Sequence, residues 1–120
     1  MDKYFENYDI KSIKNNTKIC GINYTQKILG GKWKITIIWV LRNEAKRYSE
    51  IKRFLGGISQ GSLTKQLREL EEDNLIGRKV YPEVPPRVEY FLTEKGAQLI
   101  PILDSMEKFG TLWIEKMLNK

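Results

Sequence analysis

The sequence predicts an α+β fold that is mainly α-helical, and three changes of pattern along the chain indicate it. Between Tyr48 and Asp73, apolar residues recur at spacings of three and four around one glycine pair, as in two amphipathic helices joined by a tight turn. Asn74 is expected to cap the second of these helices in the left-handed conformation. After it the apolar period falls to two residues, which is typical of β-strands. Beyond Thr93 the spacings of three and four return. We therefore expect helices first, then one hairpin, then further helices.

The composition is that of a single small basic domain. The chain has 120 residues and a mass of 14.1 kDa, with a formal net charge of +6 and a sequence pI of about 9.4, so nucleic acid is the expected partner. It has one cysteine and no histidine, which excludes a Cys/His zinc site within one chain and any Cys-His or Ser-His catalytic pair. We therefore expect no enzyme activity, and the sequence gives no reason to expect a cofactor or a metal.

The chain shows no feature of a membrane protein. Its longest apolar run, residues 35–41, is far shorter than the roughly 20 residues that a membrane-spanning helix needs. No secretory signal pattern opens the chain, and a lone thiol suits a reducing compartment. We therefore expect a cytoplasmic protein.

We expect an N-terminal arm over residues 1–19 and a folded domain over residues 20–120. The arm is polar, and its scattered aromatic residues follow no clean period, so it is either a short helix that packs on a partner subunit or a partly disordered tail. The domain begins with a helix over residues 22–29, which Gly30 and Gly31 end.

Residues 32–42 are apolar on nearly every side, and their β-branched side chains favour a strand. We nevertheless predict a helix, because a helix-turn-helix pair in a domain of this size needs a third, buried helix against its apolar faces. A short polar connection over residues 43–47 follows.

The first helix of the pair is predicted over residues 49–55. Ser49 is its expected N-cap, and Ile51, Phe54 and Leu55 lie at i, i+3 and i+4 on one buried stripe. The glycines at 56 and 57 then allow the chain to reverse, since glycine adopts positive φ without steric cost.

The second helix, predicted over residues 59–73, has two unlike faces. Ser59 is its expected N-cap, and Leu63, Leu67 and Leu70 form the buried stripe. The opposite face carries amide, hydroxyl and cationic groups: Gln60, Gly61, Thr64, Lys65 and Arg68. Such groups suit base edges and phosphates in a DNA major groove. The alternative is a solvated polar face on an ordinary helical hairpin.

The predicted DNA contacts of this recognition helix are Ser59, Gln60, Gly61, Ser62, Thr64, Lys65 and Arg68. Phosphate contacts are predicted for Lys52, Arg53 and Lys65, and they should make the affinity fall steeply with salt. Base discrimination is predicted for Gln60, Gly61, Ser62, Thr64 and Arg68.

Two runs of period two, residues 75–81 and 88–92, predict a β-hairpin. Prolines stiffen the loop between them, residues 82–87, and forbid a regular ladder there. A hairpin directly after a recognition helix is the two-stranded wing of a winged helix-turn-helix domain. Its predicted DNA contacts are Pro85, Pro86 and Arg87, with Arg87 at the tip and placed for a minor groove or a phosphate. The alternative is an exposed arginine without a role.

The C-terminal region is predicted to be helical and to form a dimer. Thr93 is the expected cap, and Pro101 either kinks this region or begins a separate helix. The apolar surface beyond it is too wide for a lone helix, so we predict terminal dimerisation helices that pack on a second copy of the chain. The predicted interface residues are Leu103, Met106, Phe109, Trp113 and Met117. The alternative is packing on the domain's own first helix.

The segments GGKWKITIIWVL, RYSEIKRFLGGISQGSLTKQLRELEEDNLI and RKVYPEVPPRVEYFLTEKG resemble one family. It is the HxlR-type winged helix-turn-helix transcriptional regulators, which are related to the MarR group. The resemblance spans roughly residues 20–110. It implies a homodimeric regulator that binds double-stranded DNA at an inverted repeat near a promoter, as a repressor or an activator.

The resemblance also makes Cys20 a candidate redox residue. Family members often carry a cysteine at this position, usually followed by proline, and in several it acts as a thiol switch; here Gly21 follows instead. Lys18 and a nearby helix start would favour the reactive thiolate, so an oxidant or a small molecule is the expected effector. The alternative is an inert, partly buried side chain.

A different class of function also remains open, namely a winged-helix module that binds another protein. The cationic character of the recognition helix argues against it, because the cores of protein interfaces are depleted in charge.

Overall fold

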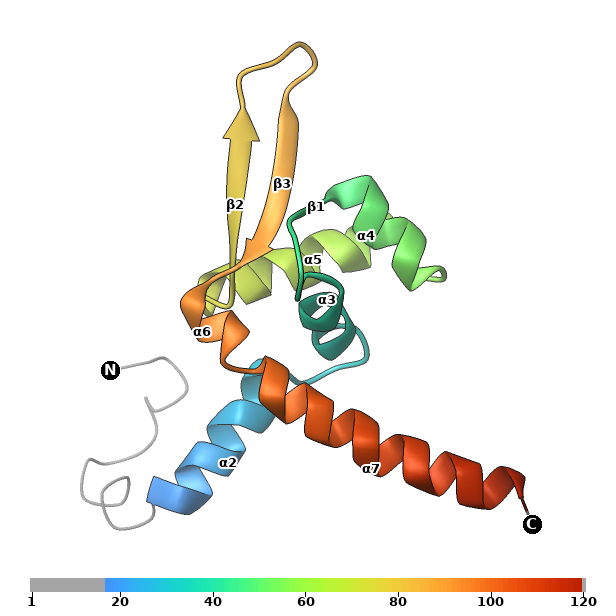
Figure 1. Ribbon diagram of the computed structural model, residues 1–120. Helices are drawn as coiled ribbons and strands as arrows, with labels where there is room; N and C mark the ends of the chain where they lie inside the picture. The colour runs from blue at the N-terminus through green and yellow to red at the C-terminus, as the bar shows by residue number, and fades with distance from the viewer. Residues whose placement is uncertain (1–16, 120) are drawn as a thin grey trace. The chain divides into compact units, whose positions relative to one another are not determined.

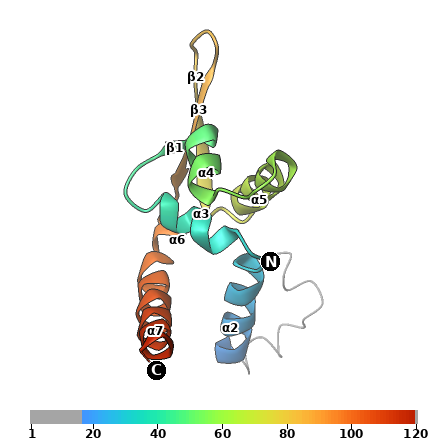
Figure 2. The same cartoon turned by 90° about the vertical axis from the view of Figure 1, so that its right-hand side faces the viewer.

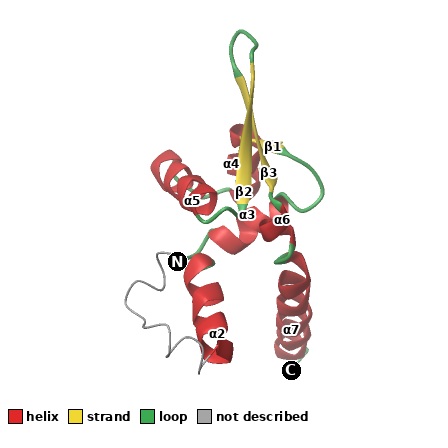
Figure 3. Ribbon diagram, turned by 90° about the vertical axis from the view of Figure 1, so that its left-hand side faces the viewer, coloured by secondary structure: helices red, strands yellow, loops and turns green. Residues whose placement is uncertain are grey.

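The computed structural model describes residues 17–119. These residues belong to two units, one ending at Lys32 and the other beginning at Trp33, and each unit is described by itself. The chain is mainly helical with one small antiparallel sheet, which confirms the predicted fold class (Figures 1 and 3). The arm was predicted over residues 1–19, and its residues 1–16 lie outside the described residues.

The described part of the first unit contains one helix, α2 (Thr17–Ile28). The prediction of a helix is confirmed, but α2 begins at Thr17 rather than at Ile22. Its polar and apolar residues form no clean stripe, and both Ile19 and Ile22 are exposed, so periodicity could not locate the start. Cys20 therefore lies within the first turns of a helix rather than before one.

The second unit begins with α3 (Lys34–Val40), and the helix predicted there is confirmed. Ile37, Ile38 and Val40 are buried, so the tertiary burial of an apolar segment outweighs the strand preference of its β-branched residues. The helix is shorter than predicted, and Lys34 at its start is also buried. That buried cation was not expected.

The helix-turn-helix pair consists of α4 (Tyr48–Leu55) and α5 (Gln60–Glu72). Two details of the predicted α4 were wrong. Ser49 is not the N-cap; Arg47 holds that position, and its backbone N–H donates to the Glu50 carboxylate at 2.9 Å. Phe54 is exposed rather than buried and lies beside the Trp39 ring, with 6.2 Å between ring centroids.

The sheet has three antiparallel strands in the order β1-β3-β2. The wing strands β2 (Ile76–Tyr81) and β3 (Arg87–Leu92) agree with the prediction to within one residue at each end. The third strand, β1 (Lys46–Arg47), was predicted as part of a loop. Its two residues pair with Tyr90 and Glu89 of β3, and two residues are too few to carry a period of two.

The segments that flank the wing are held by local caps. Asn74 has φ 59°, which confirms the predicted left-handed residue after α5. Thr93 precedes α6 (Glu94–Ala97), and its hydroxyl oxygen accepts a hydrogen bond from the Gly96 N–H at 3.1 Å, as an N-cap does. The same hydroxyl donates to the Asn74 carbonyl at 2.5 Å. Both ends of the hairpin are therefore tied together.

The last helix, α7 (Ile100–Leu118), begins one residue before Pro101, so the proline lies at the start of a separate helix, which is one of the two predicted alternatives. Pro101 occupies the first turn, where a missing N–H costs nothing. Leu99 and Leu103 are buried, whereas the residues that follow are exposed or half-buried. Within the second unit, α7 extends away from the helix-turn-helix pair on the side opposite to the wing (Figure 2).

Candidate nucleic-acid interface

The turn between α4 and α5 positions the recognition helix. Gly56 has φ 74°, and its N–H donates to the Lys52 carbonyl at 3.1 Å, which closes α4. Ile58 is buried beyond the turn. Ser59 is the N-cap of α5, as predicted, and its hydroxyl accepts from the Ser62 N–H at 3.1 Å. The start of α5 is therefore fixed by a glycine turn, a buried side chain and a cap.

The leucine stripe of α5 is buried as predicted, with Leu63, Leu67 and Leu70 at 2% exposure or less. Because these three side chains face inward, the opposite side of the helix must face solvent. The exposed residues there are Gln60, Gly61, Thr64, Lys65 and Arg68. The structure therefore brings the predicted polar face together on one side of α5. Ser62 is half-buried at its edge.

The Thr64 hydroxyl has a partner within the domain. It lies 3.2 Å from the Tyr48 hydroxyl, which itself donates to the Gln60 carbonyl at 3.0 Å. Tyr48 stands at the first turn of α4, so it links the two helices of the pair. The sequence pattern gave no signal for this link, because it joins residues on different helices.

The two predicted phosphate contacts on α4 lie beside each other in the sequence but differ in exposure. Arg53 is exposed, whereas Lys52 is half-buried. Arg53 lines a shallow hollow together with Val40, Lys46 and Phe54. Both cations therefore lie on the helix-turn-helix pair and not on the wing.

The three predicted contacts on the wing differ in their exposure to solvent. Pro85 and Pro86 are exposed in the loop, whereas Arg87 is half-buried at the first position of β3. Its guanidinium lies over the Tyr81 ring, 3.9 Å from the ring centroid, and its Nη2 is 3.4 Å from a Glu83 carboxylate oxygen. The side chain is thus folded onto the base of the loop rather than projecting from the tip.

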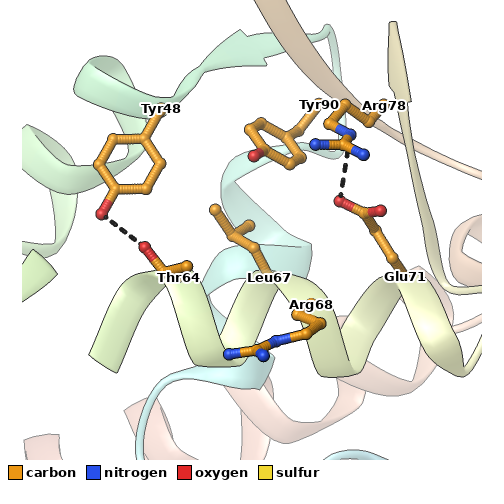
Figure 4. A pocket seen from close by; sticks show the side chains of 7 residues that line it. All are labelled: Tyr48, Thr64, Leu67, Arg68, Glu71, Arg78 and Tyr90. Carbon is orange, nitrogen blue, oxygen red and sulfur yellow. Dashed lines mark hydrogen bonds and ion pairs between the residues drawn. The ribbon is translucent and has the colours of Figure 1, made fainter. Parts of the chain in front are cut away.

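A cleft between α5 and the sheet was not predicted (Figure 4). We call it the helix–wing cleft. It has a volume of about 380 Å³ and is lined by Tyr48, Thr64, Leu67, Arg68, Glu71, Arg78 and Tyr90. Arg78 on β2 and Tyr90 on β3 are register partners, so both side chains point from the same face of the hairpin toward α5. The Arg78 Nε is 3.8 Å from a Glu71 carboxylate oxygen.

The surroundings of Tyr90 in this cleft change the pKa of its phenol. Burial raises the pKa of Tyr90, and the nearby Glu71 carboxylate raises it further, while Arg78 acts in the opposite direction. The phenol is therefore neutral at physiological pH and available as a hydrogen-bond donor.

The C-terminal half of α5 is fixed by an ion pair with α3. The Lys34 Nζ lies 2.6 Å from the Glu69 Oε2, and the Lys34 side chain is only 6% exposed while that of Glu69 is 33% exposed. Glu69 therefore has a structural partner in the core of the domain.

The predicted dimer residues of α7 do not share one environment. Leu103 is buried within the single chain. Met106, Phe109, Trp113 and Met117 are all exposed, Phe109 to 70%. The neighbouring exposed apolar residues are Ile102, Leu112, Ile114 and Leu118. A broad apolar surface therefore remains on this helix. Cys20, on α2, is a free cysteine and is buried.

A buried helix, a helix-turn-helix pair with a polar recognition face and a following hairpin define a winged helix-turn-helix DNA-binding protein. Comparison with known proteins agrees with this class and narrows it. The chain belongs to the HxlR-like helix-turn-helix family, whose model matches residues 28–118. The family resemblance is therefore confirmed, and the chain is a transcriptional regulator of the helix-turn-helix type rather than an enzyme.

Three similar proteins illustrate the match. MalR of Fusobacterium mortiferum, to which a regulatory role has been assigned, is 54% identical over 98 residues, which are 81% of this chain and 92% of MalR. An HTH-type transcriptional regulator of Methanothermobacter thermautotrophicus is 43% identical over 109 residues, covering 91% and 83% of the two chains. The solved structure of the redox regulator HypR in its reduced form has a TM-score of 0.78 and 39% identity, and the match covers 83% of this chain and 99% of HypR.

No helix within residues 17–119 is both long enough and apolar enough to cross a membrane.

Proposed function

We propose that this regulator acts as a homodimer that binds an inverted-repeat operator in double-stranded DNA. The observation that carries the proposal is the broad apolar surface of α7, which the described part of the chain leaves exposed. Exposed apolar surface of this kind is favourably buried against a second copy. A two-fold dimer would present two recognition helices, which suit half-sites about 34 Å apart.

The division of α7 into two faces supports the proposed interface. Phe109, Trp113 and Met117 follow at spacings of four on one side, whereas Asp104, Glu107, Lys108 and Thr111 lie on the other. A dimer formed through the apolar side would leave the charged side in solvent. Leu103 would then support the helix from within its own subunit.

The DNA contacts in the proposal are the predicted ones. Gln60, Gly61, Ser62, Thr64 and Arg68 would read bases, with Ser59 beside them at the start of α5. Lys52, Arg53 and Lys65 would contact phosphates. The wing residues Pro85, Pro86 and Arg87 would also contact DNA, with Arg87 leaving Glu83 to reach a minor groove or a phosphate. Losing one base-reading side chain should cost about 1–3 kcal/mol at its own base pair. The proposed domain is residues 20–120, preceded by an arm over residues 1–19.

We also propose that the thiol of Cys20 controls DNA binding. HypR is named a redox regulator and has been solved in oxidised and reduced forms, which supports a thiol-based control in this chain. Because Cys20 is buried and is the sole cysteine, oxidation should be slow and should give an intersubunit disulfide, a mixed disulfide or a sulfenic acid.

The test combines DNA selection with the oligomeric state. Purified protein is used to select binders from a random duplex library, with reducing agent or with diamide, and its mass is measured by light scattering. We expect an inverted repeat and a dimer in the reduced sample, and loss of the repeat with diamide that Cys20→Ser abolishes. A monomer that selects a single half-site would refute the dimer, and no enriched motif would refute operator binding.

The interface is tested with one pair of variants on α7. Phe109→Glu places a carboxylate on the apolar side and should give monomers with much weaker operator binding, since an unpaired charge would be buried in the interface. Thr111→Glu adds the same charge on the polar side and should leave the dimer intact. Equal effects of the two variants would contradict the proposed interface.

A further inference from the structure

The helix–wing cleft is lined by hydrogen-bond donors from three elements. Arg68 and Thr64 come from α5, Arg78 from β2 and Tyr90 from β3. The cleft is lined by two arginines and by one carboxylate, that of Glu71, so it carries one excess positive charge. A small monoanion fits this donor set better than a neutral ligand or a cation does.

Glu71 orients Arg78 but leaves N–H donors of its guanidinium available. The 3.8 Å between the Arg78 Nε and the Glu71 oxygen is longer than a hydrogen bond, and the Arg78 side chain is 52% exposed. A guanidinium has five N–H donors in a fixed fork, so it can bind a second anion while it stays beside the first. Figure 4 shows Arg78 and Glu71 facing each other across one end of the cleft.

Thr64 supplies a hydroxyl at the other end of the cleft. Tyr48 directs its single O–H to the Gln60 carbonyl, so the hydrogen bond between the two hydroxyls is donated by Thr64. Because this O–H is already used within the domain, the donors that remain for an anion lie at the Arg78 end of the cleft.

The position of the cleft identifies the anion. Thr64 and Arg68 form the wing side of the exposed face of α5, beside Gly61 and Lys65, which face solvent. A DNA strand that passes from the recognition helix to the wing must cross this edge. Its phosphodiester is a monoanion with two acceptor oxygens, and guanidinium groups bind such oxygens as a fork.

We propose that the helix–wing cleft binds one phosphodiester of the operator backbone in each half-site through the Arg78 guanidinium, with Glu71 as the residue that positions Arg78. This inference rests on the proposed operator binding and assigns a contact within it. The same phosphate would join the recognition helix to the wing, so it would fix where α5 sits along the groove.

The test is a coupling experiment between Arg78 and single phosphates. The selected operator is prepared with one backbone phosphate at a time replaced by an uncharged methylphosphonate, and affinity is measured for wild type and Arg78→Met. With natural DNA, Arg78→Met should weaken binding roughly tenfold and lower the salt dependence by about 1.8 in log–log slope, which is about 0.9 for each of the two half-sites. One methylphosphonate in each half-site should weaken wild type but should weaken Arg78→Met no further.

Lys79→Met is the matched control. It removes the same charge from the next position of β2, but Lys79 pairs with Glu89 on the other face of the hairpin and lies over the Tyr81 ring. It should show no coupling to the phosphate that Arg78 contacts. Arg78→Lys keeps the charge without the fork and should recover part of the affinity. Thermal unfolding of each variant confirms that it is folded.

The outcomes separate this inference from the proposed function. If wild type selects an inverted repeat and no phosphate couples to Arg78, the cleft inference is overturned and operator binding stands. Coupling of Lys79 to the same phosphate would overturn the cleft inference too, since the loss of affinity would then come from the lost positive charge and not from a contact at Arg78. If wild type binds no duplex specifically, both proposals fail together.

Discussion

Replacing Lys34 or Glu69 tests how the recognition helix is held in place. Glu69→Met should destabilise the fold more than Lys34→Met, because the charge left behind differs in exposure. The Lys34 side chain is 6% exposed, so its ammonium would remain buried without the carboxylate that lies 2.6 Å away. The Glu69 side chain is 33% exposed, so water can hydrate its carboxylate after Lys34 is replaced.

The expected magnitudes follow from this difference. Breaking a buried pair from one side typically costs 3–5 kcal/mol, and we expect Glu69→Met to cost about 3 kcal/mol because a lysine stem can shift its ammonium toward water. For Lys34→Met we expect about 1 kcal/mol, since the remaining carboxylate is partly hydrated. The double variant should recover most of the loss, because an apolar pair of similar volume avoids desolvation of either charge.

Urea unfolding of wild type, both single variants and the double variant gives the free energies of unfolding and their coupling. We expect a coupling of about 3 kcal/mol, because the single losses of about 3 and about 1 kcal/mol would fall to about 1 kcal/mol in the double variant. A larger loss for Lys34→Met than for Glu69→Met would refute the reasoning, and so would additive losses in the double variant. Either result would mean that the pair is not desolvated as its exposure indicates.

Three further predictions concern the cap, the hairpin junction and the cleft. Ser59→Ala should cost about 1 kcal/mol of unfolding free energy, because the Ser62 N–H loses its acceptor; an unchanged urea midpoint would contradict this. Gly96→Ala should cost about 2 kcal/mol, since a Cβ would overlap the Leu75 carbonyl oxygen and displace α6; calorimetry should show a lowered Tm. Burial raises the pKa of Tyr90 above its ordinary value, so the folded chain holds that proton more tightly than the unfolded chain does. Stability should therefore decline as pH rises from about 10 through the raised value. The stability of Tyr90→Phe should decline less over this pH range. Parallel curves of stability against pH for wild type and Tyr90→Phe would rule out the raised pKa.

The features that the sequence could predict are those that local chemistry determines. The leucine stripe of α5, the Ser59 cap and the left-handed Asn74 each depend on residues within about one helical turn of each other. The wing strands are delimited by prolines on one side and by a change of period on the other. Such signals are present in the sequence before any tertiary contact forms.

The features that the sequence missed depend on residues that are distant along the chain. Lys46 forms a strand only because Tyr90 of β3 lies beside it. Arg78 contributes to the helix–wing cleft only because the hairpin folds back over α5. Arg87 is drawn onto the Tyr81 ring across the hairpin rather than into solvent. The sequence pattern does not indicate these pairings, because each partner taken alone is an ordinary surface residue.

Hydrophobic burial alone cannot orient the recognition helix, because it is non-directional. A leucine stripe would tolerate small rotations and shifts of α5 along its axis. Directional polar contacts remove that freedom: Lys34 bonds the helix near its end, Tyr48 bonds it near its start through Thr64, and Arg78 approaches it from the wing. These contacts reach different turns of α5 from three different elements. Their loss should therefore reduce operator discrimination in addition to stability, because base reading depends on where the exposed face of α5 points.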